Sequence, residues 1–275
     1  MTDAALEAVL RRDRAIVAAA LFVLAALAWA YVLWLAADMD MGDMDDMDMS
    51  GFRMIPAGTA LMMPTTAPWT ATEFAFVFAM WAVMMVGMMT PSATPMILIY
   101  ARVGRQAAQQ GKPFAASSWF AGGYLLAWVG FALVATFAQW ALERGSWLTL
   151  KIAAASGVLS GIVLIVAGLY QWTPLKDACL WQCRTPLQFI QHHGGFRPDA
   201  FGSLALGAHH GAYCVGCCWV LMAILFAGGV MNVLWIVAVT IFVLVEKMVP
   251  VGRVISRLTG AGFFATGLWV LAQTL

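Results

Sequence analysis

The stretch SLALGAHHGAYCVGCCWVLMAILFAGGV, residues 203–230, is an apolar run that contains two histidines and three cysteines. Its length predicts a membrane-spanning helix, because about 20 apolar residues cross the hydrocarbon core of a bilayer. Polar side chains inside such a helix are costly and usually functional. The stretch therefore predicts both a helical membrane fold and a place to look for chemistry.

The composition of the whole chain agrees with a membrane protein. Of 275 residues, 63% are hydrophobic and 11% are charged, and the mean hydropathy is +0.83, whereas soluble domains carry about a quarter charged residues. The net charge of +1 and the lack of a basic stripe or Gly-rich nucleotide loop argue against a nucleic-acid partner. The apolar runs predict an all-α, polytopic transmembrane helix bundle with about seven spans: Ala15–Ala37, Glu73–Tyr100, Ser117–Trp140, Lys151–Gln171, Ser203–Val230, Asn232–Val249 and Val254–Leu275.

The basic residues predict how the bundle is oriented. Of 15 Lys and Arg residues, only Arg53, Arg144 and Lys151 lie outside if the N-terminus is cytoplasmic. We therefore expect an N-in/C-out protein of the bacterial cytoplasmic (inner) membrane, with the first span kept as an anchor because no small-residue cleavage site follows it. The expected parts are a cytoplasmic N-terminus with the first anchor (1–37), an outer loop (38–72) and a metal-binding transmembrane bundle (73–275).

The outer loop begins with DMDMGDMDDMDMSGFRM, residues 38–54, which holds six Asp and six Met residues. Met sulfur is a soft donor suited to Cu(I), while carboxylates attract any cation. Thioethers also persist in an oxidising compartment, where thiols are lost to disulfides. The segment predicts a copper-collecting loop, with a flexible low-complexity linker as the alternative; its candidate ligands are Met39, Met41, Met44, Met47 and Met49.

The second predicted span contains FVFAMWAVMMVGMMTPSATPMILIY, residues 76–100, with methionines on one broad helical face. A methionine row is often core filling, since Met packs adaptably, but its density here also suggests ligands. Pro91 and Pro95 are expected to interrupt the helix and free backbone carbonyls for neighbouring hydroxyl groups. The candidate metal ligands of this span are Met84, Met85, Met88 and Met89.

The segment KDACLWQC, residues 176–183, follows the fourth span and is expected on the cytoplasmic side. Cys179 and Cys183 are four residues apart, so a short helix would place both thiols on one face. Because cytoplasmic thiols stay reduced, a metal or redox role is favoured over a structural disulfide. Free thiols packed at the membrane surface are the alternative.

The fifth span carries the most specific pattern. His210, Cys214 and Cys217 follow an i, i+4, i+7 progression on one face, with Cys218 at its border. His209 points about 100° away from His210. Cys214 lies roughly 16 Å into the helix, close to the bilayer midplane, where the methionines of the second span reach a similar depth. This soft ligand set favours copper as Cu(I), with zinc and haem as alternatives, and glycines at 207, 211 and 216 allow a neighbouring helix to approach closely.

Three motifs together resemble a bacterial family of predicted metal-binding integral membrane proteins of unknown function. They are MWAVMMVGMMTPSATP at Met80–Pro95, KDACLWQCRTP at Lys176–Pro186 and GAHHGAYCVGCCW at Gly207–Trp219. The resemblance extends from about Glu73 to the C-terminus and implies a polytopic membrane protein that binds a metal. It implies no reaction.

These features predict a membrane protein that takes up, exports or delivers a soft metal ion, most simply copper, and leave open whether it is also an enzyme. The outer loop would collect the ion, the midplane row would hold it, and Cys179 and Cys183 would exchange it inside. Its partners would be the lipid bilayer and a periplasmic metal donor, an acceptor protein or a membrane enzyme. The alternatives are a membrane thiol oxidoreductase that uses its Cys pairs and a structural or assembly subunit in which the metal only ties helices together.

Overall fold

The computed structural model describes residues 3–39, 52–58, 62–113, 115–149, 152–154 and 156–274. Within these ranges the fold is all-α, as predicted, apart from an antiparallel pair of short strands, β1 (Phe52–Met54) and β2 (Met62–Pro64). The helices are α1 (Asp3–Met39), α2 (Ala71–Gln109), α3 (Ser117–Arg144), α4 (Gly157–Tyr170), α5 (Pro174–Arg184), α6 (Pro186–His192), α7 (Ala200–Gly228), α8 (Val233–Met248) and α9 (Gly252–Thr274).

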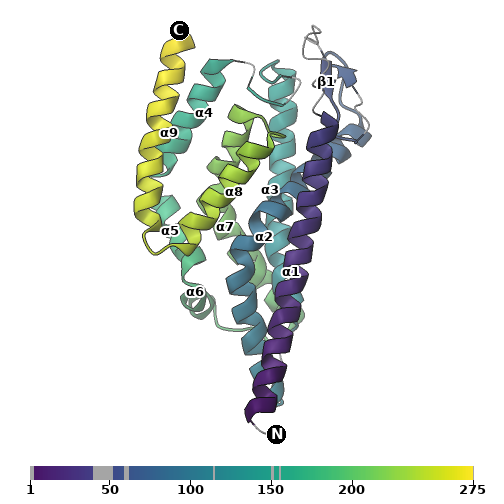
Figure 1. Ribbon diagram of the computed structural model, residues 1–275, viewed down its shortest axis with the longest axis vertical. Coiled ribbons are helices and arrows are strands. Elements are labelled where there is room, and N and C mark those ends of the chain that lie inside the picture. The colour runs from purple at the N-terminus through teal and green to yellow at the C-terminus, as the bar shows by residue number, and fades with distance from the viewer. Residues whose placement is uncertain are drawn as a thin grey trace.

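The helices form an elongated bundle in which α7 holds the middle. Helix α7 packs against α3, α4 and α5, while α2 packs against α1, α3 and α8, and α4 packs against α9. The N- and C-termini lie at opposite ends, and β1 lies at the same end as the C-terminus (Figure 1). This arrangement fits the expected N-in/C-out order, with the outer loop and the C-terminus on one side.

Five helices of the described chain are long and apolar enough to cross a membrane: α1 from Ala15, α2, α3, α7 and α9. Helices α4 and α5 meet at 67° and would together make a sixth, bent span. The expected fourth and sixth spans are therefore shorter than predicted, since α4 has 14 residues and α8 has 16. The five long helices indicate a multi-pass membrane protein.

Local hydrogen bonds explain why α4 and α8 are short. Before α4 the chain does not continue the helix: the Ala154 N–H donates to the Phe226 carbonyl, and the Val230 N–H donates to the Ile152 carbonyl. Ser156 then caps the first turn of α4. Helix α8 begins at the Asn232 cap and ends at Val249, before Pro250. These caps set lengths that an apolar run alone does not reveal.

Helix α2 is continuous through Pro91 and Pro95, contrary to the expected interruption. The hydroxyl groups of Thr90, Ser92 and Thr94 donate to backbone carbonyls in the preceding turn, at 2.6, 2.9 and 3.0 Å. The accepting carbonyls are those of Val86, Met89 and Thr90, whereas the prolines free the carbonyls of Gly87 and Pro91, so the predicted use of these hydroxyls is not confirmed. Each proline removes one donor, and the local hydroxyls help to satisfy the neighbouring carbonyls.

Glycines allow α7 to lie unusually close to α3. A Cβ atom at Gly207 would stand 2.0 Å from the Phe120 carbonyl oxygen, and one at Gly211 would stand 2.6 Å from the Ala127 Cβ. A Cβ at Gly123 of α3 would stand 1.9 Å from the Leu204 oxygen. Small residues of this kind are the usual means of close helix contact in membranes, so the predicted close approach at 207 and 211 is confirmed.

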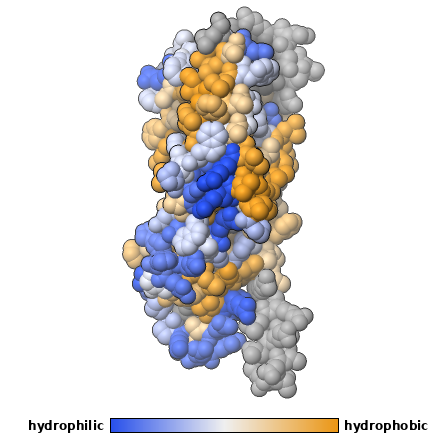
Figure 2. All heavy atoms as spheres, turned by 90° about the vertical axis from the view of Figure 1, so that its left-hand side faces the viewer, coloured by the Kyte–Doolittle hydropathy of each residue, from blue (hydrophilic) through white to orange (hydrophobic). Residues whose placement is uncertain are grey.

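Hydrophobic and hydrophilic side chains are separated on the face formed by α4, α5 and α9. Hydrophobic surface prevails in its upper part, and a hydrophilic patch lies at mid-height and extends below (Figure 2). Arg253 and Arg257 at the start of α9 approach Asp177 of α5 at 3.4 and 3.9 Å. These exposed charges suit the boundary between the bilayer and water.

The close α3–α7 contact predicts the effect of adding one methyl group. We expect Gly207→Ala to destabilise the protein by about 1–3 kcal/mol, because the new Cβ would meet backbone atoms that cannot rotate away. The matched control is Gly122→Ala in α3, where a Cβ has nothing within 4 Å and should be neutral or slightly stabilising. Thermal unfolding in detergent measures both, and equal melting temperatures for the two variants would contradict the packing described.

The positions of the chain ends predict the result of a reporter experiment. A reporter fused after Leu275 and one inserted in the α2–α3 connection at Gly111–Lys112 should report opposite sides of the membrane. The connection is expected inside and the C-terminus outside. Reporters on the same side would show that one helix does not cross the bilayer as the fold requires.

Candidate metal centre

The face of α7 that carries the predicted ligand row is buried, whereas the adjacent His209 faces outward. His210 is 3% exposed, and Cys214, Cys217 and Cys218 are 1%, 2% and 1% exposed. His209 is exposed, in agreement with its expected direction. The helical spacing therefore placed the imidazole and the thiols correctly in the interior.

A fourth thiol joins this face from α5. The Cys183 sulfur lies 4.0 Å from the Cys217 sulfur, and Cys183 is half-buried. Cys214 interacts with the side chains of Cys183, Cys217 and Cys218. The sequence suggested that Cys183 belongs to a separate inner station, but α5 folds back along α7 and brings the two sets of thiols together.

Polar groups from three other helices surround the Cys214 sulfur. The Lys247 ammonium of α8 donates to it at 2.7 Å and to the Ser92 hydroxyl of α2 at 3.2 Å. The Tyr124 hydroxyl of α3 lies 3.1 Å from the same sulfur and 3.2 Å from the Met89 carbonyl oxygen. Cys214 is thus the point at which α2, α3, α7 and α8 meet.

Sequence reasoning missed Lys247, which is 8% exposed. It was assigned to the inner basic residues because it stands near the end of an apolar run. The only signal for another role is its place in the last turn of α8 beside Glu246, whose side chain is 2% exposed. Two adjacent residues on a helix point in different directions, and here both enter the interior, Glu246 toward Lys176 and Lys247 toward Cys214.

Aromatic rings surround His210, and one of its ring nitrogens has no hydrogen-bond partner among the described residues. Its ring lies 5.0 Å from the Phe189 ring, 5.9 Å from Tyr124 and 6.0 Å from Phe120, measured between centroids. Its Nδ1 atom is buried and has no hydrogen-bond partner within the part of the chain that the structure describes. A buried polar atom without a partner is costly, and a soft metal ion is one ligand that an imidazole nitrogen would accept.

The methionine row of α2 is fully interior. Met84, Met85, Met88 and Met89 are 0–2% exposed. Helix α2 reaches the centre through Ser92 and through the Met89 carbonyl, which accepts from Tyr124. These side chains therefore fill the core of the bundle, and burial alone does not make them metal ligands.

The described side chains do not form a ready three-ligand site, since no group of three or more His, Cys, Asp or Glu residues among them is arranged to hold a metal ion. Zinc usually requires four such ligands at fixed distances. Soft thiolate and thioether ligands favour Cu(I), which is stable with fewer ligands than zinc. The Cys183–Cys217 separation suits a thiol pair that closes on such an ion.

The remaining predicted side chains lie around this centre. A Cβ at Gly216 of α7 would stand 2.9 Å from the Cys179 sulfur, so Cys179 packs directly against α7. His193 and the exposed His209 have rings 5.8 Å apart, and the His193 Nδ1 lies 2.8 Å from the Phe189 carbonyl. His192 lies beside Trp181. The histidines other than His210 thus gather near α6 rather than at the thiols.

The end of the bundle that carries β1 and β2 holds a buried polar network. The Arg53 guanidinium contacts the Glu73 carboxylate at 2.5 and 3.0 Å, and Glu143 accepts from Gln139 and Trp69. The hydrogen bond that Arg53 donates to the Glu73 carboxylate raises the pKa of Arg53 above its ordinary value. Met39 is 4% exposed at the end of α1, whereas Met41, Met44, Met47 and Met49 lie outside the described residues.

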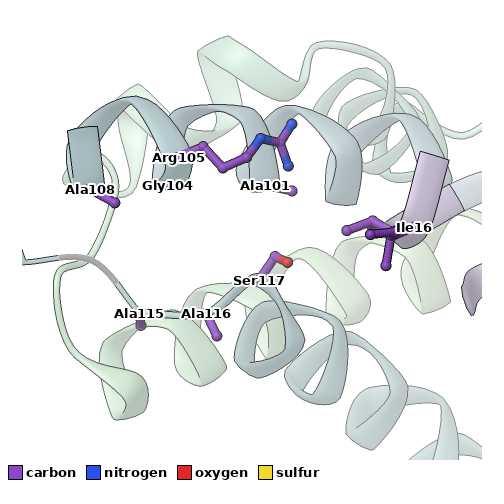
Figure 3. A pocket seen from close by; sticks show the side chains of 9 residues that line it. Ile16, Ala101, Gly104, Arg105, Ala108, Ala115, Ala116 and Ser117 are labelled. Carbon is purple, nitrogen blue, oxygen red and sulfur yellow. The ribbon is translucent and has the colours of Figure 1, made fainter. Parts of the chain in front are cut away.

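A pocket of about 320 Å³ lies between the ends of α1, α2 and α3. Ile16, Ala101, Arg105 and Ser117 line it (Figure 3). Its lining residues include no Cys, His or Met, and the Arg105 side chain extends along α2 (Figure 3). This pocket is therefore separate from the thiol centre and offers no soft ligand.

Fold and centre together define a multi-pass helical membrane protein with a buried cluster of thiols. Residues 78–270 match the family described as PpoB2, copper chaperone. Because the match covers most of the chain, the protein belongs to the PpoB2 copper chaperone family, and copper handling is its function. A chaperone also implies a partner that accepts the copper. No curated protein and no solved structure matches the chain.

The matched range bears on the sequence motifs in two ways. It contains all three motifs that carried the resemblance to metal-binding membrane proteins, and it specifies copper as the metal. It begins after the Met/Asp loop, which lies at residues 38–54. The loop is thus not part of what defines the family.

The distance between Cys183 and Cys217 predicts a specific cross-link. Mild oxidation of the copper-free protein should join these two sulfurs, because 4.0 Å is close enough for a small movement to reach the S–S bond length of about 2.05 Å. Mass spectrometry of peptides would identify the link. The link should persist in Cys179→Ser and vanish in Cys183→Ser, and a dominant Cys179 link would refute the arrangement.

Proposed function

We propose that the protein holds copper as Cu(I) between Cys183 and the α7 thiols and delivers it to an acceptor protein. The observation that carries the proposal is the meeting of Cys183 with Cys214, Cys217 and Cys218 at one buried place. Thiolates are the strongest soft ligands that a protein offers to Cu(I). The unpartnered His210 nitrogen supports the same centre.

The outer loop and the methionine row give this centre a supply of copper. In the proposed path, Met39, Met41, Met44, Met47 and Met49 gather the ion, and the Asp residues between them raise the local cation concentration. Met84, Met85, Met88 and Met89 of α2 then offer thioethers on the way to the thiols. Thioethers bind Cu(I) more weakly than thiolates, so the ion moves toward the cysteines.

The proposed orientation places the loop on the outer side of the bacterial cytoplasmic membrane. The three parts of the chain then have different tasks: 1–37 anchors, 38–72 collects and 73–275 holds the ion. The acceptor would be a copper-requiring enzyme or a soluble copper protein. Opposite placement of the N-terminus and the C-terminus in the fold supports this division (Figure 1).

A thiol oxidoreductase remains the second candidate because of one observation, the 4.0 Å approach of Cys183 to Cys217. Such a pair could exchange between dithiol and disulfide. The burial of Cys217, which is 2% exposed, argues against it, because a thiol substrate must reach the sulfur. A redox enzyme should turn over with a dithiol reductant, whereas a copper chaperone should bind and transfer metal in stoichiometric amounts.

Copper content of purified variants tests the centre. Cys214→Ser and Cys217→Ser should lose most Cu(I) while remaining folded, because Ser keeps the approximate size but removes the soft donor. His210→Ala should weaken binding by a smaller amount. Mass spectrometry of metals after loading under reducing conditions measures this, together with transfer of Cu(I) to a chromogenic chelator.

The controls separate ligands from packing. Met88→Leu nearly conserves volume, so a fall in copper content would show a thioether ligand, and an unchanged content would show core packing. His209→Ala removes an exposed imidazole and should leave copper content unchanged. Full copper occupancy in both cysteine variants would exclude the proposed centre.

A further inference from the structure

Lys247 is a buried cation whose described partners include no carboxylate. Its ammonium contacts the Cys214 sulfur at 2.7 Å and the Ser92 hydroxyl at 3.2 Å, and the residue is 8% exposed. A buried charge is costly unless an opposite charge or hydrogen bonds compensate it. Of these two partners, only the Cys214 sulfur can carry a negative charge.

The neighbouring carboxylate serves another cation. Glu246 contacts the Lys176 ammonium at 2.7 and 2.9 Å and accepts from the Ser256 hydroxyl at 2.5 Å. Lys176 and Glu246 are 1% and 2% exposed, so this ion pair is complete within the protein. Glu246 therefore does not neutralise Lys247, whose positive charge acts on the thiol centre.

We propose that Lys247 determines metal selectivity at this centre by setting its charge balance. Two thiolates and one Cu(I) ion carry a net charge of −1, and the ammonium brings the total to zero. The same thiolates with a divalent ion carry no net charge, and the ammonium then leaves an uncompensated positive charge in the interior. The inference rests on the proposed Cu(I) function and adds how the site rejects divalent ions.

Selection by ionic charge and selection by softness predict different metal preferences, so an experiment can distinguish them. Cd(II) and Ag(I) are both soft ions that bind thiolates well. In a centre that selects by softness alone, removal of the ammonium would leave the relative affinity for the two ions unchanged. A centre that selects by charge would accept Ag(I), as it accepts Cu(I), and would disfavour Cd(II) by an uncompensated charge.

The first experiment uses the wild-type protein in detergent, loaded with Cu(I) under reducing conditions. Ag(I) should displace Cu(I), whereas Cd(II) at the same concentration should not, and mass spectrometry of metals gives the bound amounts. Equal displacement by the two ions would overturn the proposal. This experiment does not depend on the folding of any variant.

The second experiment changes the charge. Lys247→Met keeps a long apolar side chain but removes the ammonium, so Cd(II) affinity relative to Cu(I) should rise on the order of tenfold or more, given the strength of charge interactions at short range. Lys247→Arg keeps the charge and should keep the preference for monovalent ions. Lys112→Met is the matched control, since Lys112 is exposed, and should behave as the wild type.

The outcomes separate this proposal from the function on which it rests. If Cys214→Ser and Cys217→Ser both keep full Cu(I) occupancy, the thiol centre itself is wrong. If Cys214→Ser loses Cu(I) but Lys247→Met keeps the wild-type order of Cu(I), Ag(I) and Cd(II), the centre stands and the role of Lys247 is refuted. A changed order in Lys247→Met alone supports the charge mechanism.

Discussion

The thiol centre depends on the close approach of other helices to α7. Without side chains at Gly207 and Gly211, the α3 backbone reaches α7, and Tyr124 is held within 3.1 Å of the Cys214 sulfur. The small surface at Gly216 likewise admits Cys179, and with it the whole of α5. Three glycines on one helix thus bring together residues that are far apart in the sequence. Close contact of this kind requires small residues in a membrane, where no hydrophobic effect drives helices together.

A second constraint is electrostatic. Among the described residues, Lys176 and Lys247 have buried ammonium groups, but Glu246 neutralises only the first. In a low dielectric, interactions between charges at short range are strong, so the second ammonium influences whatever occupies the thiol centre. The short helix α8 supplies the Glu246 carboxylate and the Lys247 ammonium from adjacent positions. One residue closes an ion pair with α5, and the next reaches Cys214, so α8 couples the packing of the bundle to its chemistry.

The sequence was sufficient for features that depend on one helix. The interior row of His210, Cys214 and Cys217 and the outward direction of His209 follow from helical periodicity. The glycine at 207 predicts that some helix approaches closely, but not that the helix is α3. Which particular segments meet was not predictable. The fold of α5 against α7 joins Cys183 to the centre, and hydrogen bonds between 152–154 and the end of α7 shorten α4. An apolar run does not specify such contacts, and Lys247 resembled an ordinary interfacial lysine.

On the proposed function, the burial of the centre determines which ligand could pass copper to an acceptor. Cys214 and Cys217 are nearly inaccessible, whereas Cys183 is half-buried on α5. Copper passes between thiolates by ligand exchange, in which an incoming sulfur must contact the ion before another departs. On the proposed function, Cys183 is the ligand best placed to meet an acceptor. Helix α5 has 11 residues and joins α4 at an angle of 67°. The bend that makes a straight fourth span a wrong prediction is thus also what lays α5 against α7 and places the half-buried Cys183 at the edge of the thiol centre.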